Sequence, residues 1–398
     1  MSATTAAPAP GPRPAAEALL PSPVPVRLVT EDGEASPGSP RSPRSARSAH
    51  ARQSPQSPQS PASSGHREPA ADRLREAYRQ MVLGRRFDRQ ASALTRQGML
   101  AVYPSSRGQE ACQIAGVLAL REEDWLFPTY RDTVAMVARG VDPVEALTLL
   151  RGDWHCGFDP TAVRVAPPCT PLATQLPHAA GMADALRRKG EGGVVMAFVG
   201  DGGTSEGDFH EALNFAAVFR APVVFLVQNN RYAISVPLDR QTAAPALAYK
   251  GVGYGVPSEQ VDGNDLVAVL AVLDAAVEHA RSGRGPYLVE AHTYRMDGHT
   301  NADDPLRYRD DDEVRRWEAA DPVRRLETYL RGRGVLTEDD IETVRTEAEE
   351  RAAELRTRMG DETPPDLLGL FEHVYAEPTP QLREQRDQLA AELKDTES

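Results

Sequence analysis

Two short polar motifs in the middle of the chain have the side chains to hold a metal ion and a phosphate group. GDG (200–202) and QNN (228–230) each directly follow an apolar run of strand length. Because the carboxyl ends of neighbouring parallel strands open onto the same crevice, Asp201 and Asn230 are expected to face each other there. A carboxylate and an amide oxygen are hard ligands that suit magnesium, which commonly also binds phosphates and water. The two motifs therefore predict a magnesium and phosphate site.

The glycines of the first motif support the same prediction. Gly202 and Gly203 allow the backbone to come close to a phosphate at the N-terminus of the following helix. Alone, GDG is also typical of a turn, and NN of a loop. Their combination, with each motif at the end of an apolar strand, favours a binding site.

The elements that must position these motifs alternate between strands and helices. The apolar runs 194–199 and 222–227 are predicted to be parallel strands buried on both faces, with a helix over 208–219 between them. Residues 286–295 predict a further strand. The sequence therefore predicts an α/β fold, in which a parallel sheet is covered by helices on both faces, with a helical C-terminal region.

Two long helices with one apolar face each are predicted outside this unit. The first starts near Arg73 and is stopped by Gly98. The second is capped by Thr337 and ends at Gly360. Its apolar face is expected to consist of Ile341, Val344, Ala348, Ala352, Leu355 and Met359.

Composition divides the chain into three regions. Residues 1–67 are rich in Pro and Ser, with too few apolar side chains to offset the entropy of ordering, so a disordered tail is predicted. VPVRLVT (24–30) is the exception and is expected to dock as an extended strand. Residues 68–330 are predicted to form the α/β domain, and residues 331–398 a helical extension.

Charge and cysteine content exclude several classes of protein. The net charge of −13 argues against nucleic acid as a general partner. The basic stretch 39–52 is interpreted as a solvated linker, with contact to an acidic partner as the alternative. No run approaches the roughly 20 apolar residues of a membrane helix, and the first residues do not resemble a secretory signal. Cys112, Cys156 and Cys169 form neither a disulfide framework nor a zinc motif, so a cytoplasmic protein is expected.

From about residue 70 onward the chain resembles a known family, the alpha chains of heterotetrameric thiamine-diphosphate-dependent 2-oxoacid dehydrogenases. GDG followed about two dozen residues later by NN is similar to the thiamine-diphosphate motif. The matching blocks are FPTYRD (127–132), TPLATQLPHAAG (170–181), GDGGTSEGDFHEALNFAA (200–217), QNNRYAIS (228–235), VDGND (261–265) and EAHTYRMDGHTNADDPLRYR (290–309). The block 371–393 looks like the branched-chain version of this subunit.

The resemblance implies a cofactor site for thiamine diphosphate and magnesium. Asp201 and Asn230 would bind the metal through their side chains, and Tyr232 through its backbone carbonyl. Arg131 would hold the diphosphate by charge-assisted hydrogen bonds. The cofactor-binding residues implied are Tyr130, Arg131, Thr170, Leu172, Asp201, Gly202, Gly203, Gln228, Asn230, Tyr232 and His299.

Two positions depart from the family pattern. Gln228 stands where branched-chain members often have an arginine against the diphosphate, which puts one charge contact in doubt. Thr170, Thr174 and Gln175 fall where some members bind a structural potassium ion. Cys169 replaces an oxygen ligand at that position, so the resemblance leaves this ion open.

His299 is the predicted catalytic residue. It matches the family histidine that helps acyl transfer to lipoamide, and an imidazole suits proton transfer near neutral pH. His155 is a second histidine candidate, at the mouth of the substrate site. Thr300 falls where animal members carry a regulatory serine.

The resemblance also implies partners and a substrate class. The glutamate that activates the cofactor comes from the beta chain in this family, and the single predicted ligand site leaves no room for a second domain. We therefore expect an alpha subunit of an α2β2 heterotetramer that works with a lipoylated acyltransferase core and dihydrolipoamide dehydrogenase. Branched-chain 2-oxoacids are the predicted substrates, with pyruvate as the alternative. A homodimeric thiamine enzyme conflicts with the length, and a binding module with a dead site conflicts with the intact polar residues.

Overall fold

A five-stranded parallel sheet forms the centre of the protein. The computed structural model describes residues 16–36, 65–153, 155–360 and 366–396. The strands lie in the order β1 (Trp125–Phe127), β2 (Val195–Gly200), β3 (Val223–Asn229), β7 (Tyr287–His292) and β6 (Ser258–Asp262), and every neighbouring pair is parallel. The predicted α/β fold class is confirmed.

Alternate side chains of the central strands enter two separate apolar cores. In β2, Val195, Ala197 and Val199 belong to one core, and Met196 and Phe198 to the other. This alternation follows from the two-residue period of a strand. It explains why the strands are continuous apolar runs, because both faces of the sheet are covered.

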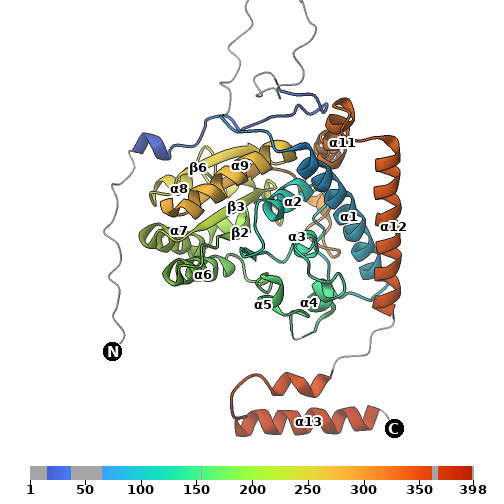
Figure 1. Cartoon of the computed structure of the whole chain (residues 1–398). Helices are drawn as coiled ribbons and strands as arrows, with labels where there is room; N and C mark the ends of the chain where they lie inside the picture. Colours follow the sequence, from blue (N-terminus) through green and yellow to red (C-terminus); the bar gives the residue numbers. More distant parts are fainter. Residues whose placement is uncertain (1–15, 37–64, 154, 361–365, 397–398) are drawn as a thin grey trace, which may run out of the picture.

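Helices cover both faces of the sheet (Figure 1). On one face lie α6 (Gln175–Lys189) and α7 (Gly207–Phe219), whose apolar residues share a core with alternate residues of β2 and β3. The other face is covered by α2 (Glu110–Leu118) and α9 (Leu266–His279). Outside α2 lie α1 (Ala71–Arg96), α3 (Thr133–Ala138), α11 (Pro322–Gly332) and α12 (Glu338–Gly360).

Shorter elements connect these layers. The hairpin of β4 (Tyr232–Ala233) and β5 (Val236–Pro237) follows β3 and leads into the 3₁₀ turn η4 (Leu238–Arg240). A second 3₁₀ turn, η3 (Gly202–Ser205), joins β2 to α7. Further short α-helices are α4 (Thr148–Arg151), α5 (Pro160–Val163), α8 (Tyr249–Val252) and α10 (Asp311–Ala319).

The two long predicted helices are present. Gly98, two residues beyond the end of α1, has a φ of +78°, a left-handed conformation that suits glycine after a helix. The side-chain oxygen of Thr337 accepts a hydrogen bond from the Asp340 amide at 3.1 Å at the start of α12. The buried residues of α12 are the six predicted from its periodicity.

Part of the predicted N-terminal tail is packed on the domain. Val26 pairs with Val261 of β6, and Val26, Leu28 and Val29 are buried. The Asp265 carboxylate accepts hydrogen bonds from the amides of Leu28 and Val29, each at 2.7 Å. The segment predicted to dock as an extended strand therefore lies against the edge of the sheet. Most of the rest of the tail lies outside the described residues.

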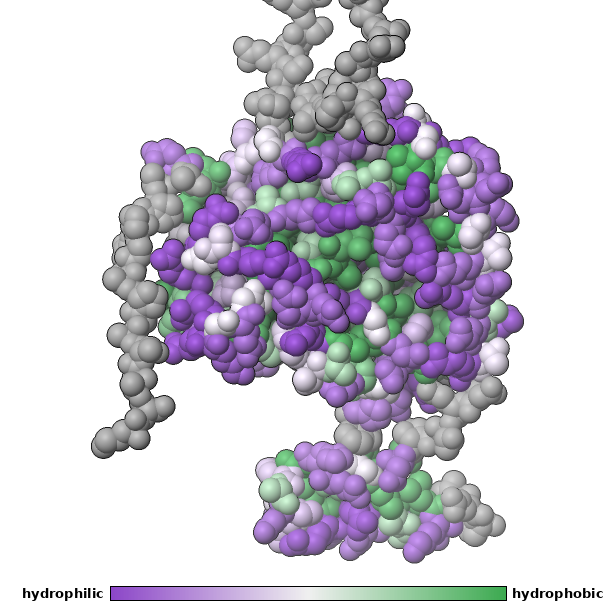
Figure 2. Space-filling view, viewed as in Figure 1, coloured by the Kyte–Doolittle hydropathy of each residue, from purple (hydrophilic) through white to green (hydrophobic). Residues whose placement is uncertain are grey.

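The C-terminal segment contains η7 (Leu367–Phe371) and α13 (Pro380–Thr396). These two elements pack against each other, and Figure 1 draws them apart from the sheet. Figure 2 shows hydrophobic residues among the hydrophilic ones on this segment, where Leu367, Leu370, Val374 and Tyr375 are exposed. Among the described helices, none is both long and apolar enough to cross a membrane.

Candidate active site

A cavity of about 440 Å³ opens at the carboxyl ends of β1, β2 and β3. This edge of a parallel sheet is where ligands bind in α/β proteins, and the volume suits a small-molecule cofactor. Every cofactor-binding residue predicted from the sequence lines the cavity: Tyr130, Arg131, Thr170, Leu172, Asp201, Gly202, Gly203, Gln228, Asn230, Tyr232 and His299. Their shared location is a finding, and their individual roles remain predictions.

Asp201 is a buried carboxylate at the end of β2. Only 1% of its surface is exposed, and burial raises its pKa. Its Oδ2 accepts a hydrogen bond from the Gln241 amide at 2.7 Å. It forms no salt bridge with any described residue, although the charge of Arg295 favours its ionised form. A buried anion of this kind is stabilised by a bound cation, so the position fits a metal ligand.

Asn230 is held in one orientation by its neighbours. Its side-chain nitrogen donates to Gln109 Oε1 at 3.1 Å, and its side-chain oxygen accepts from the Tyr232 amide at 3.3 Å. Gln109 in turn donates to Gln228 Oε1 at 3.2 Å, and Gln228 donates to a carboxylate oxygen of Asp132 at 2.7 Å. This chain of amides fixes which atom of each side chain faces the cavity. Gln228 is therefore a neutral, immobilised residue and supplies no charge for a diphosphate.

Gly202 and Gly203 are required by close packing. A Cβ atom on Gly202 would lie 2.7 Å from the Cβ of Ala233, and one on Gly203 would lie 2.7 Å from a methyl group of Val199. Both distances are below normal van der Waals contact. The turn after β2 can therefore lie against Ala233 of the β4–β5 hairpin only with glycine at position 202, and against Val199 of β2 only with glycine at position 203. Asp201 and Tyr232, on either side of the contact with the hairpin, both line the cavity.

Arg131 and His299 are in direct contact across the cavity. Arg131 Nη2 lies 2.9 Å from His299 Nδ1, and Arg131 Nη1 donates to the Ser105 carbonyl at 2.8 Å. Because arginine can only donate, His299 Nδ1 must be the acceptor, which places the imidazole proton on Nε2. Burial, followed by the positive charges of Arg131 and Arg295, lowers the pKa of His299 to about 4. His299 is therefore neutral near pH 7 in this state.

Arg295 is a second cavity arginine to which the sequence assigned no role. It donates to the Ile234 carbonyl at 2.8 Å and the Tyr308 hydroxyl at 3.0 Å. Asp303 accepts a hydrogen bond from the His299 amide at 2.6 Å and another from Tyr308. Asp303 thus orders the histidine loop rather than being a solvated acidic residue. Arg295 lies in the TYRMDGHT block; the sequence predicts a strand through this position, whereas β7 ends at His292 and leaves Arg295 in the loop that reaches the cavity.

A buried carboxylate below the cavity supports Arg131. Asp88 of α1 accepts hydrogen bonds from the Ser105 hydroxyl at 2.7 Å, the Tyr103 hydroxyl at 2.9 Å and the Ser106 amide at 2.8 Å. The same Ser105 provides the carbonyl that Arg131 binds. Asp88 therefore fixes the loop on which the arginine rests.

Three residues bordering the cavity have positive φ angles: Ala173 at +63°, Arg231 at +75° and Ile234 at +57°. This conformation is uncommon for non-glycine residues and is a clear outlier for β-branched Ile234. Such strain gathers at binding sites, where surrounding contacts enforce it. Here the hydrogen bond from Arg295 to the Ile234 carbonyl is one of those contacts.

Two predicted positions lie elsewhere or have other partners. His155 does not line the cavity, and its Nδ1 accepts a hydrogen bond from the Gly157 amide at 3.0 Å, so the structure does not place it at the substrate mouth. In the predicted potassium site, Thr170 and Gln175 line the cavity, whereas Thr174 does not. The Gln175 nitrogen donates to the Phe198 carbonyl at 2.7 Å. The described cysteines are free.

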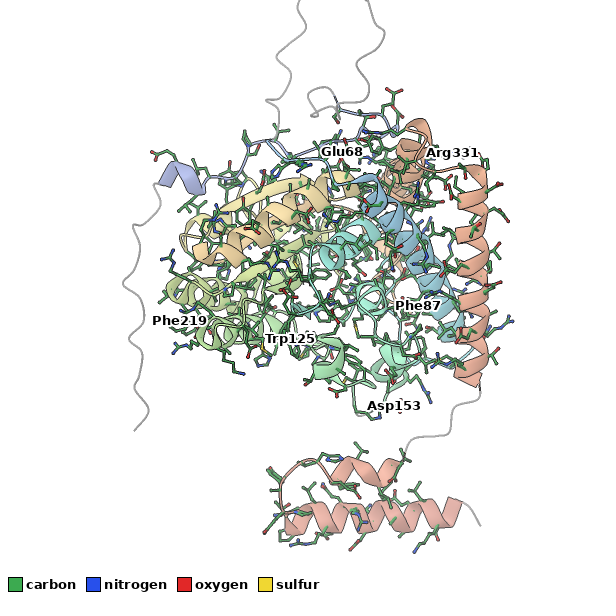
Figure 3. All side chains as sticks on the ribbon, in the orientation of Figure 1. Glu68, Phe87, Trp125, Asp153, Phe219 and Arg331 are labelled. Atoms are coloured by element: carbon green, nitrogen blue, oxygen red, sulfur yellow. The ribbon has the colours of Figure 1, made fainter. Side chains whose placement is uncertain are left out.

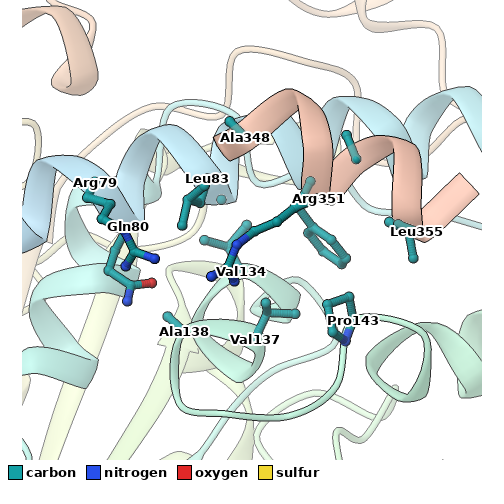
Figure 4. Close-up of a pocket in the computed structure, with 13 residues that line it drawn as sticks. Arg79, Gln80, Leu83, Val134, Val137, Ala138, Pro143, Ala348, Arg351 and Leu355 are labelled. Carbon is teal, nitrogen blue, oxygen red and sulfur yellow. The ribbon is translucent and has the colours of Figure 1, made fainter. Parts of the chain in front are cut away.

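A second cavity, of about 120 Å³, lies under α12 (Figure 4). Leu83, Val134, Val137 and Leu355 form much of its wall. Its two arginines are already paired with carboxylates, because Arg79 and Arg351 both contact Glu347 and Arg79 also contacts Glu76. It is a gap in helix packing, without the converging polar groups of the first cavity.

The fold and the larger cavity define a class of protein: an α/β protein with a cofactor-sized cavity at the carboxyl edge of its parallel sheet. Residues 78–366 match the family model described as dehydrogenase E1 component. The chain belongs to this family, whose members depend on thiamine diphosphate. The family predicted from the sequence is confirmed.

Two groups of relatives refine this assignment. The chain is 48% identical over 332 residues to 3-methyl-2-oxobutanoate dehydrogenase subunit alpha of Mycobacterium tuberculosis, which covers 83% of this chain and 90% of the relative. It is 40% identical over 318 residues to pyruvate dehydrogenase E1 component subunit alpha of Staphylococcus aureus, which covers 79% of this chain and 85% of the relative. Both names match the enzymes predicted from the sequence.

Proposed function

We propose that this chain is the alpha subunit of a 2-oxoacid dehydrogenase that acts on branched-chain 2-oxoacids of the 3-methyl-2-oxobutanoate type and transfers the acyl group to a lipoyl group. The observation that carries the proposal is the convergence of Asp201, Asn230, Arg131 and His299 in one cavity. The 48% identical relative named for 3-methyl-2-oxobutanoate supports the substrate class. Pyruvate is the second candidate, because the 40% identical relatives carry that name.

The residues of the cavity fit thiamine diphosphate with magnesium. When bound, this cofactor supplies the nucleophilic carbon and the electron sink that decarboxylation of a 2-oxoacid requires. Asp201, Asn230 and the Tyr232 carbonyl would hold magnesium. The guanidinium of Arg131 would bind the diphosphate, with Tyr130 beside it. Thr170 and Gln175, which line the same wall, would supply oxygen ligands to a potassium ion.

His299 would serve acyl transfer. Free of an anion, it is neutral because burial, and after it the charges of two facing arginines, lower its pKa. A diphosphate that pairs with Arg131 would cancel part of this positive field and return the pKa of His299 toward its ordinary value. The imidazole could then carry a proton at neutral pH and donate it from Nε2 to a lipoyl sulfur. Leu172 and Ile234 provide apolar surface at the cavity that would help to exclude water.

A beta subunit completes the proposed enzyme. The relatives are named as alpha subunits, which implies a beta partner. We propose an α2β2 heterotetramer that works with a lipoylated acyltransferase and dihydrolipoamide dehydrogenase in the cytoplasm. Phe215, Val218 and Phe219 on α7 are exposed apolar side chains suited to a subunit contact. Phe219 lies at the outer edge of the molecule (Figure 3).

The test is an assay of the purified chain alone and with its beta subunit. The pair should release carbon dioxide from 3-methyl-2-oxobutanoate with a higher kcat/KM than from pyruvate, and the isolated chain should show no turnover. A preference for pyruvate would select the second candidate. Turnover by the isolated chain would refute the need for a beta subunit.

A further inference from the structure

The side chain of Gln241, just after η4, contacts the Asp201 carboxylate from outside the cavity lining. Its nitrogen donates to Asp201 Oδ2 at 2.7 Å and to the Val236 carbonyl at 2.9 Å. These two acceptors use both N–H bonds of the amide. The orientation of the amide is therefore determined, with its nitrogen toward Asp201 and its oxygen turned away.

Among the described residues, the Asp201 carboxylate accepts one side-chain hydrogen bond, and Gln241 donates it. Because Asp201 is only 1% exposed, this donor at 2.7 Å fixes the direction of the carboxylate. A fixed carboxylate presents its oxygens to the metal without further ordering.

The same amide joins the two sides of the metal site. Asp201 directly follows β2, whereas Val236 belongs to the hairpin that carries Tyr232, whose carbonyl is a proposed metal ligand. Through its bonds to Asp201 and to the Val236 carbonyl, Gln241 ties this hairpin to the end of the strand. The distance between the proposed ligands is thus set partly by one residue.

The oxygen of Gln241 gives an independent indication. Oε1 is buried and has no hydrogen-bond partner among the described residues. Buried carbonyl oxygens are normally paired, often with an ordered water. Oε1 can therefore accept a hydrogen bond from an ordered water without disturbing the two bonds that the nitrogen makes.

We propose that Gln241 is a positioning residue of the metal site, which orients the Asp201 carboxylate and the Tyr232 hairpin for magnesium. This inference rests on the proposed function. Outer residues that orient metal ligands typically contribute 10- to 100-fold to metal affinity. Loss of the Gln241 amide should therefore lower the affinity for magnesium. It should lower the affinity for the diphosphate cofactor much less when magnesium is saturating.

The test compares Gln241→Met and Gln241→Asn with the wild type in the assembled alpha/beta protein. Methionine keeps the length without the amide, and asparagine keeps an amide that is one methylene too short. Calorimetry with thiamine diphosphate at increasing magnesium should show an apparent magnesium Kd raised by about 10- to 100-fold in both variants. At saturating magnesium, cofactor affinity should return to within about threefold of the wild type, and turnover should recover with it.

Gln260→Met is the matched control. Gln260 is a buried glutamine whose nitrogen donates to the Ser22 carbonyl at 2.7 Å and whose oxygen contacts His292 at 2.8 Å, away from the cavity. Its substitution should lower the Tm without changing magnesium affinity. An unchanged magnesium Kd in either folded Gln241 variant overturns the inference. A wild-type complex that binds no thiamine diphosphate with magnesium overturns the proposed function instead.

Discussion

Arg131 donates a hydrogen bond to Nδ1 of His299 at 2.9 Å, so the residue expected to bind the diphosphate touches the residue expected to serve acyl transfer. Asp303 holds the backbone of His299 from the other side at 2.6 Å. Occupation of the cavity by an anion and the protonation state of the histidine are thereby coupled. Protonation of His299 adds a proton at Nδ1, so this hydrogen bond must open, and an anion that pairs with Arg131 favours its opening.

The first prediction concerns the pKa of His299. Without a ligand this pKa lies near 4, below the ordinary 6.5, so the imidazole is neutral above pH 5. An anion on Arg131 should raise the pKa by roughly one unit or more, because it removes part of the repulsion against the imidazolium. Histidine NMR of the assembled protein, with and without inorganic pyrophosphate, would measure the change.

His279 is the internal control for this titration. Its pKa is also lowered to about 4, by burial and by Arg284, at the end of α9. Pyrophosphate should leave the His279 pKa unchanged. If the His299 pKa does not move while pyrophosphate binds, the proposed coupling through Arg131 is wrong.

The second prediction concerns the metal. Asp201→Ala removes a buried carboxylate whose pKa is raised by burial, so the variant should fold with unreduced stability. It should lose at least about 100-fold in affinity for thiamine diphosphate with magnesium. Calorimetry on the alpha/beta complex measures this loss. Asp239→Ala, at an exposed carboxylate of η4, is the control. Equal affinities for the two variants would exclude Asp201 as a ligand.

The third prediction separates two stages of the reaction. His299→Ala should lower the coupled reaction with lipoylated acyltransferase and NAD by about 10²–10⁴-fold, the usual contribution of an acid–base group. Decarboxylation measured with an artificial electron acceptor should fall much less. His155→Ala, outside the cavity lining, should leave both rates unchanged. Equal loss of both activities in His299→Ala would assign the histidine to decarboxylation rather than to acyl transfer.

The fourth prediction concerns Thr300, which lines the cavity next to His299. A negative charge there would oppose a diphosphate held by Arg131. Thr300→Glu should therefore weaken thiamine diphosphate binding by about tenfold or more, and Thr300→Gln, of equal size and no charge, should not. Fluorescence titration of both variants at low and high salt would measure the effect. The same loss in both would indicate a steric effect instead of an electrostatic one.

Local sequence patterns were sufficient to predict elements that depend only on residues close together in the chain. Apolar runs identified β2 and β3, and the 3.6-residue period identified all six buried residues of α12. Each polar motif directly follows a predicted strand. This predicted that Asp201 and Asn230 lie at one edge of the sheet, because the carboxyl ends of parallel strands share an edge. No long-range information was needed for these predictions.

Contacts that support the site from distant parts of the chain could not be predicted from such patterns. Gln241 reaches Asp201 over 40 residues, and nothing near either residue in the sequence indicates the contact. In the sequence, Asp88 is an ordinary carboxylate of a helix. Only the folded structure brings the hydroxyl groups of Ser105 and Tyr103 to it. For residues 24–30 the apolar run indicated docking, but the partner, Asp265, lies more than 230 residues away and could not be predicted from the sequence.

The last prediction tests the backbone strain at the cavity. Ile234 has a φ of +57°, which is unfavourable for a β-branched residue, and 55% of its surface is exposed. Asparagine tolerates this conformation, so Ile234→Asn should stabilise the protein by about 1 kcal/mol while losing little buried apolar surface. Thermal unfolding of the assembled protein would measure the gain as a higher Tm.

Val236→Asn is the matched control for this substitution. Val236 lies on the same hairpin, has 42% of its surface exposed and is not among the residues with positive φ, so asparagine should give no gain there and should weaken the strand. The stabilised Ile234→Asn variant should also bind the cofactor less tightly, because the apolar side chain at the cavity is lost while the carbonyl bound by Arg295 is kept. A lower Tm for Ile234→Asn than for Val236→Asn would mean that packing of the isoleucine, and not its backbone conformation, determines the stability of this turn.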